Sequence, residues 1–180
     1  CDQARALVHT SNLYGIGHQE TLGGMLARSA GMDRVFFGNS GAEAIECALK
    51  ITRLIGHARG QACPGVIVME HSFHGRTMAA LSATGSRKAQ AGFEPLLGGF
   101  VQAPFGDPEA IAAIARRHRV VAAVLVEPIQ GEAGVRGIAG SLPVIEPDEG
   151  MRLVEAGVGE RLNAAVEMAE RLHQAARASS

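Results

Sequence analysis

The sequence predicts an α/β fold built on a mostly parallel sheet. Short runs of β-branched or aromatic residues at 35–37, 66–69, 100–102 and 120–126 alternate with segments of helical periodicity. Strands that alternate with helices form βαβ units, and such units make parallel sheets. The run 120–126 is apolar without alternation, which predicts a strand buried on both faces.

Two segments carry clear helix signals. Between residues 42 and 55, apolar residues recur every three or four positions, so we expect an amphipathic helix there. Ser40 and Glu43 have the spacing of a capping box, in which each side chain accepts a hydrogen bond from the other residue's amide. Asp107 and Pro108 are a typical N-cap and first helical residue, and they open a second helix.

Composition excludes several classes of protein. The 180 residues are 47% hydrophobic, which favours one domain with a buried core. A net charge of -1 gives no electrostatic basis for binding nucleic acid or an anionic membrane. Three cysteines without a CxxC spacing argue against a disulfide framework or a zinc ribbon. No apolar run approaches the roughly 18 residues of a membrane helix, and no signal peptide is recognisable, which favours a cytoplasmic protein.

The composition of the chain changes near residue 137. Residues 137–150 are rich in glycine, proline and acid, which is typical of a linker or long loop. Within 151–180, apolar residues again recur at helical spacing. We therefore expect an amphipathic helix with a packing or partner face and no catalytic residue.

The stretch FFGNSGAEAIECALK, residues 36–50, leads from a predicted strand straight into a helix. One interpretation is that the capping box alone explains its small polar residues. The other is that the free amides of Gly41 and Ala42, at the positive end of the helix dipole, bind a phosphate group.

The stretch HSFHGRT, residues 71–77, allows three interpretations. A metal site at His71 and His74 is weakly supported, because the sequence places no third ligand nearby. Arg76 offers a two-point fork that suits a carboxylate. Phe73 offers a platform for a flat ring. A phosphate site, an aromatic platform and an arginine at successive strand ends together indicate a phosphorylated aromatic cofactor and a substrate with a carboxylate.

Four successive blocks resemble the class III, pyridoxal-phosphate-dependent aminotransferases, and within them the acetylornithine branch most closely. The blocks are NSGAEAIECALK, HSFHGRTMAALSATG, AGFEPLLGGFVQAPFGD and VLVEPIQGEAGVR. Four ordered blocks at suitable spacing are a specific signal, and the resemblance covers about residues 9–136. It implies that residues 1–136 are an incomplete large domain of a fold-type-I transferase.

The resemblance implies roles for the cofactor-binding residues. Gly41 and Ala42 would donate backbone amides to the phosphate of pyridoxal 5′-phosphate, with Ser40 beside them. Phe73 would lie against the pyridine ring, with His74 next to it.

The resemblance also implies a substrate side. Arg76 would bind the α-carboxylate of the substrate, and Glu127 and Glu132 would line the substrate side. The partners implied are an amino acid and a 2-oxo acid, and the chain is expected to form a homo-oligomer. No metal is expected.

The catalytic lysine of the family has no counterpart in this sequence. Aminotransfer needs a lysine that forms a Schiff base with the cofactor and an acid that faces the pyridine nitrogen. The lysines are Lys50 and Lys88, and neither matches the Schiff-base position. Both are interpreted as solvated surface lysines. The sequence therefore assigns no catalytic residue.

The expected function is PLP-dependent transfer of an amino group from an N-acetylornithine-type donor to 2-oxoglutarate, in arginine biosynthesis. Two alternatives stay open. One is a non-catalytic fragment that binds phosphate or the cofactor, and the other is an interaction module that uses the helix predicted within 151–180.

Overall fold

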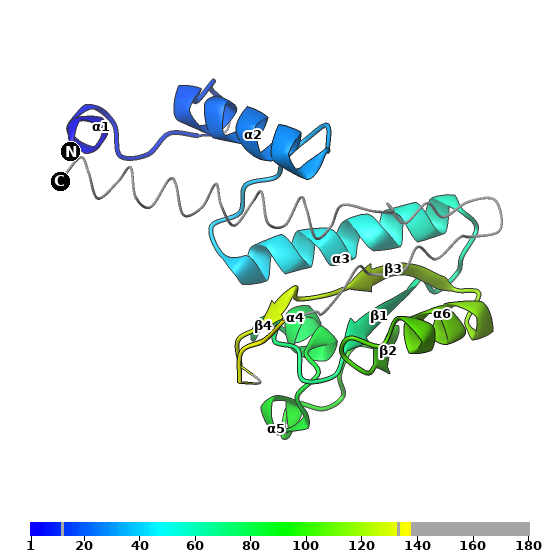
Figure 1. The fold of residues 1–180 in the computed structure, drawn as a ribbon. Helices are drawn as coiled ribbons and strands as arrows, with labels where there is room; N and C mark the ends of the chain where they lie inside the picture. The colour runs from blue at the N-terminus through cyan, green and yellow to red at the C-terminus, as the bar shows by residue number, and fades with distance from the viewer. Residues whose placement is uncertain (12, 133, 138–180) are drawn as a thin grey trace. The chain divides into compact units, whose positions relative to one another are not determined.

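The structure, a computed structural model, describes residues 1–11, 13–132 and 134–137. These residues fall into two compact units, the first ending at Phe36 and the second beginning at Phe37 (Figure 1). The predicted linker beyond Gly137 and the predicted helix within 151–180 lie outside the described residues. Among the described residues, no helix combines the length and the apolar character needed to cross a membrane.

The first unit contains two helices, α1 (Asp2–Ala6) and α2 (Gly17–Ala30). Helix α2 ends at Gly31, which has a φ of 64° and donates its amide to the carbonyls of Ala27 and Arg28. Glycine is favoured at such a left-handed C-cap because it has no Cβ.

The second unit is built on a parallel sheet. Its elements are α3 (Gly41–Ala58), β1 (Gly65–Met69), α4 (Met78–Ala83), α5 (Arg87–Gln90), β2 (Phe100–Ala103), α6 (Pro108–Arg117), β3 (Val121–Leu125), β4 (Ile129–Gln130) and β5 (Arg136–Gly137). The strand order is β2-β1-β3, and β1 pairs in parallel with both neighbours. The predicted α/β fold with a parallel sheet is confirmed.

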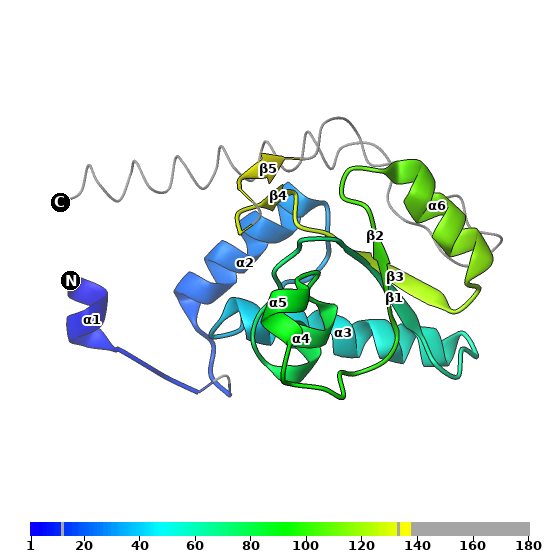
Figure 2. The same ribbon diagram turned by 90° about the horizontal axis from the view of Figure 1, so that it is seen from below.

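Helices cover both faces of this sheet (Figure 2). On one face, Leu49 of α3 and Ala83 of α4 pack against Val66 and Val68 of β1. On the other face, Ile111 of α6 joins a core cluster with Ile67, Met69, Ala103 and Val121. Every residue of β1 is buried, since this strand has a neighbour on each side and helices on each face.

Three of the four predicted strands are confirmed, as β1, β2 and β3. The strand predicted at 35–37 is wrong, because this stretch is irregular in the structure. Val35 and Phe36 are 36% and 61% exposed, and among the described residues no strand pairs with them. A β-branched and aromatic run forms a strand only where a partner completes its hydrogen-bond ladder.

The strand at 120–126 is less buried than predicted. Val121 is buried, but the other residues of β3 are half-buried. Within the described sheet, β3 is an edge strand. It pairs with β1 on one side and has no strand beside it on the other, so that side is less buried.

Both predicted helices are confirmed, with side-chain caps. The Ser40 hydroxyl accepts a hydrogen bond from the Glu43 amide over 3.2 Å. The reciprocal bond of a capping box, from the Ser40 amide to the Glu43 carboxylate, does not form among the described residues. At the start of α6, Asp107 Oδ1 accepts from the Ala110 amide over 2.9 Å.

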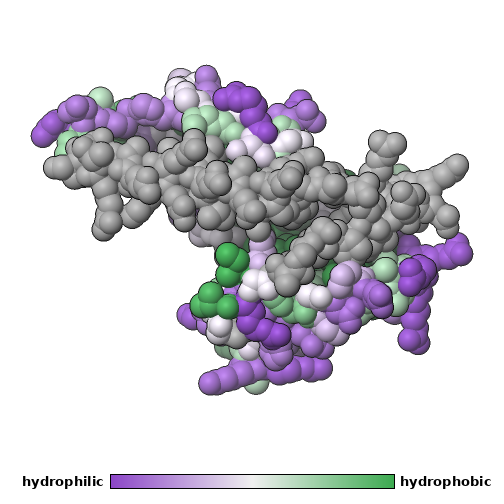
Figure 3. Space-filling view, viewed as in Figure 1, coloured by the Kyte–Doolittle hydropathy of each residue, from purple (hydrophilic) through white to green (hydrophobic). Residues whose placement is uncertain are grey.

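The apolar face of α3 is wider than the face that the sheet covers. Leu49 is buried, whereas Ile51 and Ile55 are 47% and 43% exposed. On the side of the molecule shown in Figure 3, the visible described surface is largely hydrophilic, with smaller hydrophobic patches.

Shortening a central core residue tests this packing. Ile67 is fully buried in β1, so Ile67→Ala should lower the free energy of unfolding by about 2–5 kcal/mol, measured by urea denaturation. The matched variant Ile51→Ala removes the same atoms from a half-exposed site and should cost much less. Equal losses at the two positions would contradict the described core.

Candidate functional site

Because the strands of the sheet are parallel, their carboxyl ends lie at the same edge of the sheet. The stretch 71–77 follows β1, and Glu127 lies two residues after the end of β3. Because β1 and β3 are parallel neighbours, these segments leave the sheet side by side.

The corner at Ser40–Ala42, where an irregular segment enters α3, is open. A Cβ added to Gly41 would meet no atom within 4 Å. Among the described residues, no acceptor binds the amides of Gly41 and Ala42, which are the first two of an 18-residue helix. The corner therefore has the free donors and the helix end that an anion needs.

The loop that carries Arg76 packs against this corner. A Cβ added to Gly75 would lie 3.1 Å from Ala42 Cβ and 3.0 Å from Ala80 Cβ, so no larger side chain fits without displacement. Gly75 is also at a φ of 133°, which L-residues rarely adopt. A hydrogen bond from the Thr77 hydroxyl to the Glu46 carboxylate ties the same loop to the next turn of α3.

Glu127 holds the backbone of Phe73. Its Oε2 accepts a hydrogen bond from the Phe73 amide over 2.9 Å, between residues 54 positions apart. Burial raises the pKa of Glu127, the nearby Glu132 adds to the rise, and the bond from Phe73 opposes it. Glu127 thus connects the end of β3 to the segment that carries the aromatic ring.

His74 is buried as a neutral side chain. It is 5% exposed, and its backbone amide donates to the Thr84 hydroxyl over 3.1 Å. Burial lowers the pKa of His74 from 6.5 to about 4. Its Nε2 atom is buried and has no hydrogen-bond partner in the described part of the chain.

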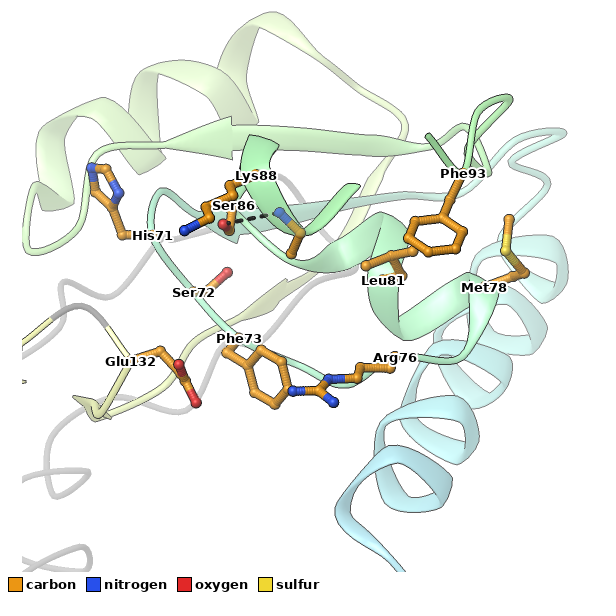
Figure 4. Close-up of a pocket in the computed structure, with 11 residues that line it drawn as sticks. His71, Ser72, Phe73, Arg76, Met78, Leu81, Ser86, Lys88, Phe93 and Glu132 are labelled. Atoms are coloured by element: carbon orange, nitrogen blue, oxygen red, sulfur yellow. Dashed lines mark hydrogen bonds between the residues drawn. The ribbon is translucent and has the colours of Figure 1, made fainter. Parts of the chain in front are cut away.

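A cavity of about 750 Å³ lies beside Phe73 (Figure 4). As Figure 4 shows, the Phe73 ring is flanked in this view by Arg76 on one side and Glu132 on the other. Three predicted site residues therefore share one cavity, and the other lining residues are His71, Ser72, Met78, Leu81, Ser86, Lys88, Ala89 and Phe93.

The remaining predicted site residues do not line this cavity. Ser40, Gly41 and Ala42 belong to the corner that contacts Gly75, two residues beyond Phe73. Glu127 accepts a hydrogen bond from the Phe73 amide, and the His74 side chain is buried. The roles assigned to all eight residues by resemblance stay predictions.

Sequence reasoning missed the part of the wall formed around α5. Lys88, interpreted as an ordinary surface lysine, is exposed but lines the cavity with Phe93 and Met78. The helix cap at Ser86, which accepts from the Ala89 amide, was the local signal for a helix there. Among the described residues, no group of three or more metal-ligating side chains comes together.

Comparison with known proteins identifies the family of the chain. The family model of the class-III aminotransferases matches residues 1–141. The chain therefore belongs to the class III aminotransferase family, which depends on pyridoxal 5′-phosphate, as the sequence predicted.

Similar curated proteins are acetylornithine aminotransferases. That of Nitrosomonas europaea is 56% identical over 135 residues, which are 75% of this chain and 34% of the relative. Acetylornithine aminotransferase 1 of Bordetella pertussis is 47% identical over 135 residues, again 75% of this chain and 34% of the relative. The chain thus spans about a third of the length of these relatives.

Similar solved structures are aminotransferases as well. The ornithine aminotransferase of Toxoplasma gondii matches with a TM-score of 0.69 and 34% identity, over 77% of this chain and 34% of that one. A second structure of that enzyme, with a TM-score of 0.68 and 34% identity over 76% of this chain and 33% of that one, has PLP at partial occupancy in its active site. The fold prediction of a PLP-dependent transferase is confirmed.

The contact between Gly75 and Ala42 can be tested by a single methyl group. Gly75→Ala should lower the free energy of unfolding by roughly 1–3 kcal/mol, since it adds both a steric contact and strain at positive φ. Thermal unfolding would measure the loss. Gly41→Ala, which meets open space, is the control, and equal melting temperatures for the two variants would contradict the contact.

The burial of His74 predicts a pH dependence. The pKa of His74 is about 4 in the folded chain and 6.5 in the unfolded chain. Between these two pH values the unfolded state therefore binds more protons than the folded state. The free energy of unfolding should fall as the pH drops from 6.5 towards 4, by roughly 3 kcal/mol in total.

Urea denaturation at several pH values would show this slope. His74→Gln should flatten it, whereas His118→Gln, at the C-cap of α6 where the side chain is exposed, should leave it unchanged. A slope that persists in His74→Gln would mean that His74 titrates normally.

Proposed function

We propose that this chain provides the phosphate-binding and substrate-carboxylate-binding part of an aminotransferase that uses pyridoxal 5′-phosphate. The proposed donor is an N-acetylornithine-type amine and the proposed acceptor is 2-oxoglutarate, in line with the acetylornithine aminotransferases to which the chain is similar. The observation that carries the proposal is the packing of Gly75 on Ala42, which sets the open corner beside the loop of Phe73 and Arg76.

The residues present fit this cofactor. The unengaged amides of Gly41 and Ala42 suit its phosphate, and the open space at Gly41 leaves room for the phosphate oxygens. Phe73, half-buried at the cavity wall, suits its flat ring. When bound, pyridoxal phosphate withdraws electrons from the amino-bearing carbon of the substrate.

The roles proposed for the chain's own residues are to bind the substrate and to orient the groups around the cofactor. The exposed Arg76 guanidinium faces the cavity and would hold the α-carboxylate of the substrate in a two-point geometry. Glu127 fixes the backbone of Phe73, the residue whose ring would face the cofactor. The neutral His74 places no charge next to that ring.

We further propose that the chain by itself has negligible turnover. Its lysines are Lys50, exposed on α3, and Lys88, exposed on α5, and the family resemblance gives neither the role of the covalent cofactor-binding lysine. Formation of glutamate from acetylornithine by a PLP-saturated sample of this chain would overturn this statement. Assembly as a homo-oligomer and a cytoplasmic location stay predictions.

Removing one amide donor from the corner tests the phosphate site. Gly41→Pro removes the first N–H of α3 but keeps the helix, because proline is favoured at the first helical position and the preceding Ser40 is extended. The affinity for pyridoxal phosphate should fall by about tenfold, the loss expected for one hydrogen bond to a charged group. Equilibrium dialysis would measure it.

Two controls make the result specific. Gly41→Ala and Gly41→Pro both place a Cβ in the open space at position 41, but only Gly41→Ala keeps the amide, so Gly41→Ala should bind pyridoxal phosphate more tightly than Gly41→Pro; unphosphorylated pyridoxal should bind every variant equally weakly. Equal affinity of Gly41→Pro and Gly41→Ala for pyridoxal phosphate would overturn the proposed phosphate site.

A further inference from the structure

A second, smaller cavity lies between α3 and the segment that enters β2. Its volume is about 170 Å³, and we call it the α3 groove. None of its described lining residues lines the cavity beside Phe73 or has a role in the proposed function. The charged side chains of its wall are Glu46, Lys50 and Arg53, all from α3. The groove is therefore a separate place in the fold with charges of its own.

The two cations of the α3 groove have no ion-pair partner among the described residues. Lys50 and Arg53 are three positions apart on α3, so their side chains leave the same face of the helix. Neither forms an ion pair in the part of the chain that the structure describes. Glu46 accepts a hydrogen bond from the Thr77 hydroxyl. With two cations and one acid, the described wall of the groove carries a net positive charge, which attracts an anion.

The other wall of the groove offers backbone donors. Gly98 and Gly99 line it, and among the described residues no acceptor binds their amides. A Cβ added to Gly98 would meet no atom within 4 Å, so the backbone there is open to a ligand. Gly99 has a φ of 99°, a conformation that L-residues rarely adopt. The groove thus combines two cations from α3 with two unengaged amides from a glycine pair.

Two contacts hold the stretch of α3 that carries the cations. A Cβ added to Gly56 would lie 2.4 Å from Pro64 Cβ, so the end of the helix is in direct contact with the segment before β1. About three turns earlier, the Thr77 hydroxyl donates to Glu46. Lys50 and Arg53 lie between these two contacts along the helix. Their Cα positions are therefore fixed on both sides.

The glycine pair is fixed as well. The Leu97 amide donates to the Ser82 hydroxyl over 2.9 Å, and the Gly99 carbonyl accepts from the Val66 amide over 2.8 Å. Leu49 and Val66, which are 7% and 4% exposed, give the groove an apolar, buried lining between the two walls. Because the backbone on both walls is set before a ligand arrives, little entropy is lost in ordering it on binding.

The size and the donors of the groove favour a tetrahedral oxyanion. A water molecule takes about 30 Å³ in the liquid, so 170 Å³ has room for roughly five or six atoms other than hydrogen. Inorganic phosphate is an ion of this size. Two cations and two amides suit the oxygens and the double charge of a phosphate group better than the two oxygens and single charge of a carboxylate.

We propose that the α3 groove binds a phosphate group through Lys50, Arg53 and the amides of Gly98 and Gly99. This site is distinct from the corner at Ser40–Ala42 and does not depend on the proposed function. Inorganic phosphate and the phosphate of a small monoester share the chemistry that the groove recognises. Two titrations distinguish these two sources.

The first titration adds inorganic phosphate to the whole chain at low salt and follows the amide signals by NMR. The signals of Gly98 and Gly99 should shift together with one dissociation constant, and the affinity should fall as sodium chloride is added. Acetate should bind about threefold to fivefold more weakly, the loss expected for one exposed ion pair. Equal affinity for acetate and phosphate would overturn the assignment to a phosphate group.

The second titration replaces inorganic phosphate by methyl phosphate. Equal affinity for the two supports a site that accepts the phosphate group of a larger molecule. Binding of inorganic phosphate alone supports a site for the free ion. Shifts of Gly98 and Gly99 with neither ligand overturn the proposal if they are also absent with every other phosphate concentration up to saturation of the instrument's range, because the groove then binds no phosphate group.

Variants assign the binding to the two cations. Lys50→Met and Arg53→Met should each weaken phosphate binding about threefold to fivefold, and the double variant about tenfold or more. Lys50→Arg keeps the charge and should keep the affinity. Arg59→Met removes an exposed arginine at the C-cap of α3, outside the groove, and should bind like the unmodified chain. Unchanged affinity in the double variant overturns the proposal.

The corner at the start of α3 gives a separate readout in the same spectra. Gly41→Pro should leave the phosphate-induced shifts of Gly98 and Gly99 unchanged. If phosphate shifts Gly41 and Ala42 but neither glycine of the groove, the groove binds no phosphate and the proposed function stands. If the groove signals shift while Gly41 and Ala42 respond to neither phosphate nor pyridoxal phosphate, the groove stands and the proposed cofactor site fails.

Discussion

The described site depends on the contact between Gly75 and Ala42. The loop after β1 approaches the start of α3 so closely that a side chain at position 75 would collide with Ala42 and Ala80. This packing sets the distance between the free amides of the helix and the ring of Phe73. A ligand with an anionic group and a flat ring can bind both only if that distance is fixed before it arrives, which lowers the entropy lost on binding.

Hydrogen bonds from elsewhere in the fold support the same loop. Glu127, at the end of β3, holds the Phe73 amide, and Thr84 holds the His74 amide. Each partner comes from a different element of the sheet unit, so the loop is defined by tertiary structure more than by its own sequence. The raised pKa of Glu127 and the lowered pKa of His74 both follow from this burial.

Local patterns predicted the scaffold well. Strands β1 to β3 and helices α3 and α6 follow from apolar periodicity and from the caps Ser40 and Asp107, which act within a few residues. The strand prediction for residues 35–37 was wrong because a strand needs a neighbouring strand to complete its hydrogen bonds, and the local sequence does not show whether one is present. Motif resemblance predicted the family, and two of the residues to which it gave site roles, Phe73 and Arg76, line one cavity.

Long-range contacts could not be read from the sequence. The bond between Glu127 and Phe73 spans 54 positions, and the place of Lys88 depends on the buried Gln90 that follows it by two residues. The central claim is that the corner and the Phe73 loop form one site, and an NMR titration with pyridoxal phosphate tests it most directly. The account predicts that the amide signals of Gly41, Ala42, Phe73 and Gly75 shift together with one dissociation constant; shifts confined to only one of the two segments would contradict it.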